Sequence, residues 1–543
     1  MEKSFFEEKV NYNGISALDE VKSYTHFDAK ISMKKCWDYI SDPKKVATHS
    51  FFPFIRFEQV FEKYVLKDKK NDEREKKFKT REICYASHID GCIYTYYAAE
   101  LNEKYNQALL DAGIDSVKSD GTRHSSVVAY RDVLEGQSNI NFAHDAIQFI
   151  RQIKDCMVII GDFKSFFDRL NHAYLKKQIK NILQVEELSE DWYAVFKSIT
   201  KYSYVDLSQL MFRLCVAGES SFKELYVKNI KHDDFDSSLN LCINERDAVA
   251  CGQADYKSIQ KFAGANKIVK NEETINCYKG HCTNRFCYKA FNTLNKIDIT
   301  LARENGLIKY PHRLNDAGKE ERMGIPQGSA ISAVLANVYM FEFDKAIFNY
   351  INKLGGKYMR YSDDFIIILP RDDKFPEHLE FLQKTRKDAK VGLEDKKTKI
   401  FEVNLDDEIP IKSCSKLYLN KGEDGKNAID YLGFTFDGKE VTIKAKTIFK
   451  YYYRMYSKIK YIKLQREKRK EKVGTANLYK NYSSKNFTWQ EDGDDELTPT
   501  KKNRGNFLTY IKRVKEVFVE DKEIDTPVRH HLSKIATRLN SKD

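Results

Sequence analysis

The sequence predicts an α+β fold in which an antiparallel sheet carries acidic residues at the tips of its strands. Two short apolar runs, at residues 158–160 and 365–369, are rich in β-branched or aromatic residues and predict buried strands. Asp162 follows the first run, and Asp363 and Asp364 directly precede the second. Adjacent acids before an apolar run indicate a hairpin whose tip holds negative charge.

The acidic residues indicate phosphoryl-transfer chemistry. Two carboxylates so close together repel, so one of them binds a proton unless a cation lies between them. A pair of Mg²⁺ ions relieves that repulsion and holds the attacking and leaving oxygens of a phosphoryl transfer. The sequence therefore predicts the palm of a nucleotidyltransferase. Taken alone, the tetrapeptide Tyr361-Ser362-Asp363-Asp364 is equally typical of a solvated turn.

Further segments stand in a fixed order around these acids. They are Met323-Gly324-Ile325-Pro326-Gln327-Gly328-Ser329, Gly392-Leu393 with Lys397-Thr398-Lys399, and Tyr431-Leu432-Gly433-Phe434. From about residue 80 to residue 440, the order and the residues of these motifs resemble those of the reverse transcriptases. The resemblance implies a right-hand polymerase with fingers, palm and thumb that makes DNA from an RNA template.

The resemblance gives the residues of the two acidic segments their roles. Asp162, Asp363 and Asp364 stand where the family holds two catalytic Mg²⁺ ions, and Phe163 stands where a backbone carbonyl completes the ligands. Phe167 falls at the position that blocks a ribose 2′-hydroxyl, which implies selection of deoxynucleotides. For Phe167 by itself, a core aromatic is the alternative interpretation.

Other matching residues concern the nucleotide and the primer. Gln327 and Gly328 lack bulk before a predicted helix, so the backbone approaches nucleotide and template. Lys397 matches a residue proposed to protonate the leaving pyrophosphate, with a solvated lysine as the alternative. Arg131 would bind triphosphate oxygens in a bidentate manner, with a surface arginine as the alternative. The residues that resemble the primer-gripping hairpin are Tyr431, Leu432, Gly433 and Phe434.

The spacing of the motifs predicts the domain organisation. Asp162 and Gly324 lie further apart than a minimal palm requires, which indicates an inserted subdomain. The expected parts are an N-terminal extension with fingers at 1–150, a first palm segment at 151–205, the insertion at 206–300, a second palm segment at 301–440 and a helical basic thumb at 441–543. Apolar residues at helical spacing also predict helices over 331–338 and near 507–511.

The expected insertion contains a cluster of cysteines. Cys277, Cys282 and Cys287 form a C-x4-C-x4-C pattern with His281 between them. Structural zinc sites usually begin with a closer pair and require four ligands in good geometry. Buried reduced cysteines are the preferred interpretation, so we expect no Zn²⁺.

Composition favours a polyanionic partner. The 543 residues include 92 Lys and Arg against 80 Asp and Glu, which gives a formal charge of +12. Basic residues gather at 63–81 and at 454–472, and tyrosines stand among those of the second tract. Such a mixture contacts phosphates and stacks on bases, which predicts a structured RNA as a partner. A solvated basic helix is the alternative.

Cysteine usage and hydropathy predict a cytoplasmic protein. The 11 cysteines are scattered through a large chain, which argues for reduced thiols rather than a disulfide framework. No apolar run approaches the length of a membrane span, and the start of the chain does not resemble a signal peptide.

Within the reverse transcriptases, the sequence is most similar to the bacterial defence-associated and abortive-infection group. The segments that carry this resemblance are 49–55, 85–90 and 430–438. It implies an antiphage role, cDNA synthesis from dNTPs on a dedicated non-coding RNA, and either a homo-oligomer or a partner reverse transcriptase. The alternatives are a template-independent or protein-primed DNA polymerase of the same group, a mobile-element or retron-like reverse transcriptase, and a catalytically idle RNA-binding palm. The intact acids speak against the last.

Overall fold

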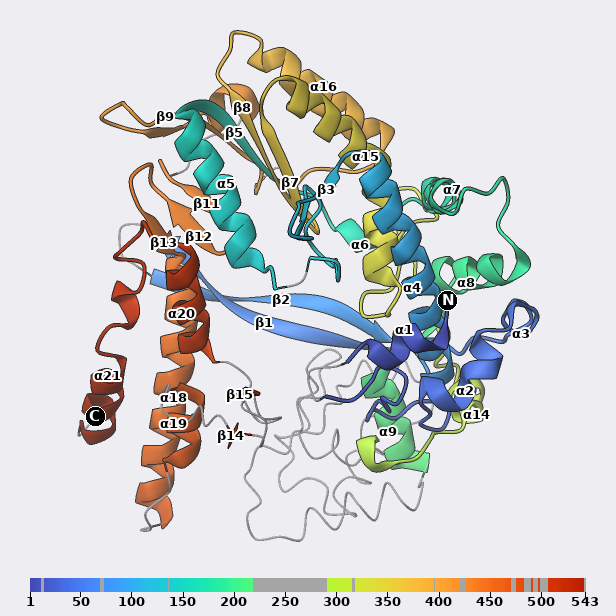
Figure 1. Ribbon diagram of the computed structural model, residues 1–543. Coiled ribbons are helices and arrows are strands. Elements are labelled where there is room, and N and C mark those ends of the chain that lie inside the picture. The colour runs from blue at the N-terminus through green and yellow to red at the C-terminus, as the bar shows by residue number, and fades with distance from the viewer. Residues whose placement is uncertain are drawn as a thin grey trace. The chain divides into compact units, whose positions relative to one another are not determined.

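The computed structural model separates into two compact units, each made of two stretches of the chain (Figure 1). Unit 1 comprises residues 1–108 and 165–340, and unit 2 comprises residues 109–164 and 341–543. The described residues are 1–10, 14–68, 73–134, 136–217, 291–314, 318–394, 396–419, 426–469, 475–482, 490–491, 497–498 and 506–541.

Unit 2 is built around a five-stranded antiparallel sheet in the order β10-β9-β5-β8-β7. Its strands are β5 (Asp155–Asp162), β7 (Lys357–Tyr361), β8 (Asp364–Pro370), β9 (Lys399–Asn404) and β10 (Ile411–Ser413). The central strands β5 and β8 are runs of Ile, Val and Phe because both of their faces are buried. The two predicted strands are therefore present within an antiparallel sheet, and the structure pairs them with each other.

Different elements pack on the two faces of this sheet. Val158 on β5 and Ile366 on β8 share a core with α5 (Asn139–Ile153), with the small sheet β11-β12-β13 and with α20 (Phe507–Val517). The three strands of the small sheet are β11 (Ile429–Tyr431), β12 (Phe434–Phe436) and β13 (Val441–Ile443). Figure 1 shows α16 (Phe375–Asp388) on the side of the large sheet away from α5.

The described C-terminal helices of unit 2 contribute to two hydrophobic cores, and the rings of Tyr451 on α18 (Ala445–Arg469) and Phe507 on α20 are in contact. A separate small core joins α18, α19 (Ala476–Tyr482) and α21 (His531–Asn540) through Met455, Ile459 and Ile535. The α20 helix instead packs on α5. The expected boundary at residue 440 thus cuts through the small sheet, because β13 pairs with β12 across it.

Unit 1 contains a three-stranded sheet with helices around it. The long strands β1 (Phe54–Asp68) and β2 (Glu73–Tyr85) form an antiparallel pair, and β6 (Tyr204–Asp206) lies parallel to β1. Its helices are α1 (Lys3–Glu8), α2 (Met33–Ile40), α3 (Pro43–Ala47), α4 (His88–Asp111), α6 (Phe166–Arg169), α7 (His172–Leu183), α8 (Glu190–Thr200), α9 (Leu207–Ala217) and α14 (Ile299–Glu304). The predicted helix after residue 331 is α15 (Ser332–Lys353), which begins in unit 1 and ends in unit 2.

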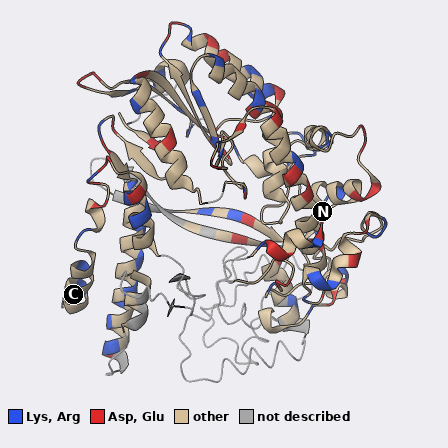
Figure 2. Ribbon diagram, in the orientation of Figure 1, with Lys and Arg blue, Asp and Glu red and all other residues tan. Residues whose placement is uncertain are grey.

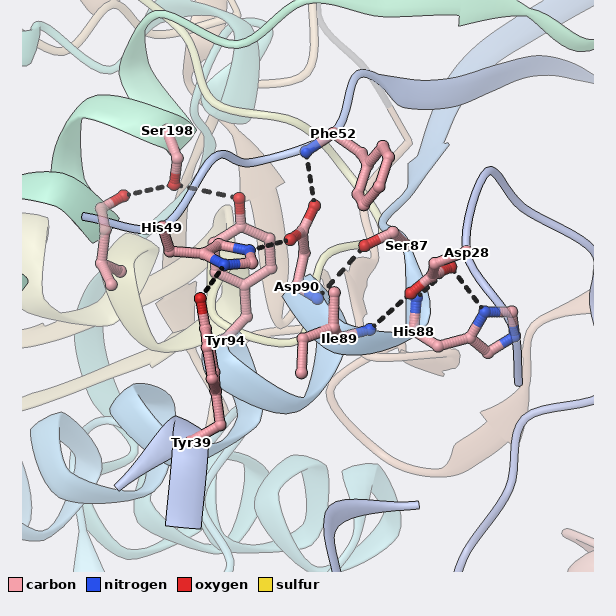
Figure 3. A network of polar contacts seen from close by, with 11 residues as sticks. Asp28, Tyr39, His49, Phe52, Ser87, His88, Ile89, Asp90, Tyr94 and Ser198 are labelled. Carbon is pink, nitrogen blue, oxygen red and sulfur yellow. Dashed lines mark hydrogen bonds and ion pairs between the residues drawn. The ribbon is translucent and has the colours of Figure 1, made fainter. Parts of the chain in front are cut away.

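A buried polar network joins the start of α4 to the N-terminal region (Figure 3). Asp90 accepts hydrogen bonds from His49 Nε2 at 2.7 Å and from the Phe52 backbone N–H at 2.9 Å. Asp28 accepts from the backbone N–H groups of His88 and Ile89 and pairs with the His88 ring. Because these N–H groups are unpaired donors at a helix start, Asp28 caps α4 from a distance in sequence.

The expected insertion at 206–300 begins within the sheet of unit 1. Its first residues complete β6 and form α9, which packs against β1 and β6. Cys277, His281, Cys282 and Cys287 lie outside the described residues, so the absence of zinc stays a prediction. Over the described parts of the chain, no helix combines the length and the apolar character that a membrane crossing requires.

Candidate active site

Two carboxylates meet at the ends of the central strands of unit 2. Asp162 ends β5 and Asp364 begins β8, and the register places these residues directly opposite each other. Directly opposite residues in an antiparallel pair project to the same face of the sheet. This is the face of Val158 and Ile366, which α5 and the β11–β13 sheet cover further along the strands. The local β-propensity of each run creates the strands, and their register brings the acids together.

Asp363 completes the cluster from the turn between β7 and β8. Tyr361 and Asp364 are register partners, so Ser362 and Asp363 form a two-residue hairpin loop. Ser362 has a positive φ of 60°, the backbone region that tight hairpin turns demand. The Asp363 carbonyl accepts the Phe163 N–H at 2.9 Å, which ties this turn to the residue after Asp162.

The electrostatics of the cluster are those of crowded negative charge. The pKa of Asp364 is raised to about 6, first by partial desolvation of its carboxyl group and then by the charges of Asp363 and Asp162. Burial also raises the pKa of Asp162, and Lys397 opposes this shift. The Lys397 ammonium forms an ion pair with the Asp162 carboxylate. The Lys397 ammonium, together with the more weakly acting Lys444, thus offsets part of the negative charge of this cluster.

A loop from unit 2 brings Lys397 to this position. Gly392 accepts the Lys164 N–H at 2.8 Å, and Glu394 donates to the Asp162 carbonyl at 2.7 Å. Leu393 forms an isolated antiparallel bridge with Phe163. The loop therefore continues the backbone pairing beyond the end of β5 and places a basic residue beside Asp162.

The donor set fits divalent cations such as Mg²⁺. Asp162, Asp363 and Asp364 supply hard carboxylate oxygens, and the raised pKa of Asp364 shows that the cluster favours added positive charge. The ring of Phe163 is buried, and its backbone carbonyl as a metal ligand stays a prediction. Over the described residues, no three acidic, histidine or cysteine side chains already converge as a metal cage, and Lys397 holds one of the acids.

Arg131 lies elsewhere than the sequence analysis expects. Its guanidinium is fully buried and forms an ion pair with the equally buried Asp115 of β3 (Asp115–Val117). It also donates to Ser125 Oγ at 3.1 Å and to the Val127 carbonyl at 3.1 Å. In this geometry Arg131 stabilises the loop around it and presents no free edge to a triphosphate. Its predicted contact with substrate has no support from this arrangement.

The predicted nucleotide-side residues lie together in unit 1. The Phe167 carbonyl accepts the Ile325 N–H at 2.9 Å, and the Gln327 carbonyl accepts the Cys84 N–H at 2.7 Å. Gly328 has a φ of 107°, and a Cβ there would lie 2.7 Å from the Cys84 carbonyl oxygen. The segment around Gln327 therefore packs so closely on the end of β2 that residue 328 requires glycine. Phe167 itself is partly exposed.

The predicted primer hairpin is a tight turn whose outer residues are core. Leu432 and Gly433 have positive φ values of 44° and 97°, which is the pattern of a type I′ turn. Tyr431 and Phe434 are buried in the core of unit 2. Only Leu432 and Gly433 are left to contact a primer, and Asn139 Nδ2 donates to the Leu432 carbonyl at 3.0 Å.

Two features that support the strand ends around Asp363 are not predicted from the sequence. Arg360 is fully buried, pairs with Asp344 of α15 at 2.6 Å and donates to the Ser362 carbonyl at 2.9 Å. Gly161 leaves room for the ring of Phe365 on the neighbouring strand. The tract Met359-Arg360-Tyr361 shows an arginine within a strand, and this interruption of an apolar pattern is the one signal that could have identified Arg360.

Residues 283–436 match the family model described as reverse transcriptase (RNA-dependent DNA polymerase). The chain contains a reverse transcriptase domain. The matched model describes RNA-dependent DNA polymerases, which is the enzyme class that the sequence predicts. The match includes Asp363 and Asp364 but begins after Asp162, and it covers less than a third of the chain. The register between β5 and β8 is therefore what joins Asp162 to the reverse transcriptase domain.

Solved structures show only a distant likeness. Apo telomerase from Candida tropicalis truncated from its C-terminal domain has 12% sequence identity and a TM-score of 0.33, over 78% of this chain and 63% of that one. Telomerase from Candida albicans in complex with a TWJ fragment of telomeric RNA has 11% identity and a TM-score of 0.32, over 94% and 66%. The chain spans less than two thirds of the length of both. No curated protein matches the chain.

Proposed function

We propose that this protein makes cDNA on an RNA template by two-metal nucleotidyl transfer and acts in bacterial antiphage defence. The observation that carries the polymerase activity is the pair Asp162–Asp364 across β5 and β8, with Asp363 in the adjoining turn. The reverse transcriptase domain supports RNA as the template. The defence role is supported by the similarity of short segments to the defence-associated group, chiefly segments 49–55 and 85–90. The buried network joins these two segments.

In this proposal Asp162, Asp363, Asp364 and the Phe163 carbonyl hold two Mg²⁺ ions. When bound, such ions lower the pKa of the attacking 3′-hydroxyl and neutralise the charge of the departing pyrophosphate. Lys397 forms an ion pair with Asp162. When the triphosphate binds, the Lys397 ammonium leaves this carboxylate for the phosphate oxygens, and it then donates a proton to the departing pyrophosphate. Leu432 and Gly433 hold the primer end through the partly exposed turn of their hairpin.

Deoxynucleotide selection falls to unit 1 in this proposal. The ring of Phe167 excludes the 2′-hydroxyl of a ribonucleotide, and its backbone is fixed by the hydrogen bond to Ile325. Gln327 and Gly328 supply a flat backbone surface for the nucleotide and the template, because Gly328 has no side chain to intervene.

The α18 helix supplies the proposed nucleic-acid surface. The rings of Phe449, Tyr453 and Tyr461 are 73%, 58% and 53% exposed, a large apolar surface to leave in water. Basic residues alternate with these rings along the same exposed side of the helix, which carries much of the positive charge of this region (Figure 2). They are Lys446, Lys450, Arg454 and Lys460. Rings that stack on bases between cations that bind phosphates suit a bound RNA.

Primer extension with the purified full chain tests the polymerase activity. We expect Asp363→Asn, which keeps the size of the side chain but removes an anionic ligand, to lower incorporation of dNTPs at least about a hundredfold in Mg²⁺. The matched control is Asp373→Asn, an exposed acid on the loop after β8. Equal rates for Asp363→Asn and the wild type would refute the active-site assignment. Incorporation without any template would instead favour the template-independent alternative.

The RNA partner is tested by sequencing the nucleic acid that copurifies at low salt. Replacing Lys446, Lys450, Arg454 and Lys460 by Gln should reduce RNA retention and phage protection together. A plot of log affinity against log salt concentration has a negative slope. Each lost phosphate contact should make that slope less steep by about 0.7 to 0.9. Changing the exposed residues Lys374, Lys384, Lys387 and Lys390 to Gln removes equal charge and should have little effect. A wild type that carries no discrete RNA and copies any primed template equally would refute the dedicated RNA.

A further inference from the structure

Two strained residues from distant parts of unit 2 are joined at the catalytic turn. The Ser362 hydroxyl donates a hydrogen bond to the Tyr130 hydroxyl oxygen at 3.1 Å. Both residues have a φ of 60°, in the left-handed region that side chains other than glycine rarely adopt. For a residue as bulky as tyrosine this conformation persists only where the surroundings impose it.

The backbone on both sides of this hydrogen bond is firmly held. Arg360 donates its N–H to the Ser126 carbonyl at 2.7 Å, and Val128 donates to the Arg360 carbonyl at 3.0 Å. The segment before Tyr130 thus lies parallel to β7 as an additional edge. Two fully buried ion pairs, Arg131–Asp115 and Arg360–Asp344, follow Tyr130 and precede Ser362. These anchors explain how both residues are kept in a strained conformation.

The hydrophobic core does not explain the position of Tyr130. Its side chain is 49% exposed, so burial of the ring offsets little of the backbone strain. Its hydroxyl instead reaches the residue directly before Asp363, on the turn that separates β7 from β8. Tyr130 thus keeps a strained backbone conformation beside the acidic cluster although its ring is only partly buried. Such backbone strain is typical of residues with a functional role.

We propose that Tyr130 is a positioning residue for the catalytic turn: its hydroxyl holds Ser362 and thereby fixes where the Asp363 carboxylate points. This inference rests on the proposed polymerase function. Arg131, which the sequence offered as a triphosphate ligand, serves instead to fix the loop that presents Tyr130. The segment 126–131 then contributes to catalysis through geometry rather than through a contact with substrate.

The test is a double-mutant cycle on the full chain, with Tyr130→Phe, Ser362→Ala and the two combined. Losing one hydroxyl hydrogen bond should lower kcat for dNTP incorporation about fivefold, while KM for the dNTP changes less than about twofold. The combined variant should be no slower than either single variant, because both remove the same bond. Tyr310→Phe, at a tyrosine that is 71% exposed, is the matched control.

A second readout does not depend on turnover. Binding of Mn²⁺ to the purified protein, followed by electron paramagnetic resonance, should weaken in Tyr130→Phe and in Ser362→Ala by a similar factor, and should be unchanged in Tyr310→Phe. Unchanged Mn²⁺ binding, or effects on kcat that multiply in the combined variant, would overturn the proposal. The wild type could bind Mn²⁺ more tightly than Tyr130→Phe and Ser362→Ala and yet fail to extend a primer. This result would refute the polymerase function and leave the positioning role of Tyr130 intact.

Discussion

Gly161 and Phe365 lie directly opposite each other on β5 and β8, and the Phe365 ring fills the space that a side chain at residue 161 would need. Gly161 immediately precedes Asp162, and Phe365 immediately follows Asp364. Because side chains alternate along a strand, this contact is on the face opposite the two acids. The face opposite the two acids is therefore filled by the Phe365 ring, which packs directly over Gly161.

Gly161→Ala should impair both catalysis and stability. The new methyl group must displace the Phe365 ring or the strand, and overpacking of this kind costs about 1 to 3 kcal/mol. The displacement moves Asp162 relative to Asp364, so we expect kcat to fall by about tenfold or more. Primer extension and urea unfolding on the same preparation measure the two effects.

The double variant Gly161→Ala with Phe365→Leu provides the control for this mechanism. The smaller side chain at residue 365 removes the collision, so part of the lost rate should return. If the double variant is slower than Gly161→Ala alone, the ring of Phe365 is needed for another reason and the packing explanation fails.

Phe167→Ala should admit ribonucleotides that the wild type rejects. The ring would no longer occupy the volume of the 2′-hydroxyl, while the backbone hydrogen bond between Phe167 and Ile325 remains available. Competition between dNTPs and rNTPs in primer extension measures the preference, which should fall by about tenfold or more. Phe5→Ala, at an exposed ring in α1, is the comparison. An unchanged preference would remove Phe167 from the nucleotide site.

Lys397→Ala separates two roles of this lysine. If its ammonium protonates the leaving group, the single-turnover rate should fall about a hundredfold, the lower end of the range for a general acid. The neighbouring exposed Lys396→Ala should retain the wild-type rate. A wild-type rate in Lys397→Ala, together with a lower Mg²⁺ requirement, would show that Lys397 acts only as the counter-ion of Asp162.

The Asp28 cap of α4 should make unit 1 sensitive to acid. Burial opposes ionisation of Asp28, yet its hydrogen bonds with His88 and Ile89 outweigh burial and lower its pKa. A carboxylate with a lowered folded-state pKa stabilises the fold above its unfolded pKa, near 3.9, and loses this effect as the pH falls through the folded value. At pH 7, Asp28→Asn should cost about 1 to 3 kcal/mol in urea unfolding.

The matching control for Asp28→Asn is Asp38→Asn, at an exposed residue of α2. The difference between wild type and Asp28→Asn should shrink as the pH is lowered below about 4, because the wild-type carboxylate is then progressively protonated. A difference that stays constant from pH 7 to pH 3 would mean that the charge of Asp28 contributes nothing and that shape alone matters at this cap.

Local pattern was sufficient for the elements that carry the acids. The apolar runs beside Asp162 and Asp364 form β5 and β8, the helical spacing after residue 331 forms α15, and the adjacent acids lie at a hairpin. Periodicity of 2 or 3.6 residues is a property of neighbours in the chain, so the sequence alone reveals it. The ordered motifs likewise predicted the reverse transcriptase domain that the family match contains.

The partners of individual side chains were decided only by the tertiary structure. The sequence placed Arg131 at a triphosphate, whereas burial beside Asp115 binds its charge internally, because a desolvated guanidinium requires a paired carboxylate. The structure also groups α5, expected mostly with the fingers, and α20, expected with the thumb, around the core of the unit 2 sheet.

The sequence by itself determined which residues are acidic, apolar or small and in what order they occur, and that order was enough to identify the chemistry. The opposition of Asp162 and Asp364, the fit of Phe365 over Gly161 and the bond between Tyr130 and Ser362 required the fold. Each joins residues about 200 positions apart in sequence. Such contacts depend on strand register, and register depends on the packing of whole faces rather than on any local pattern.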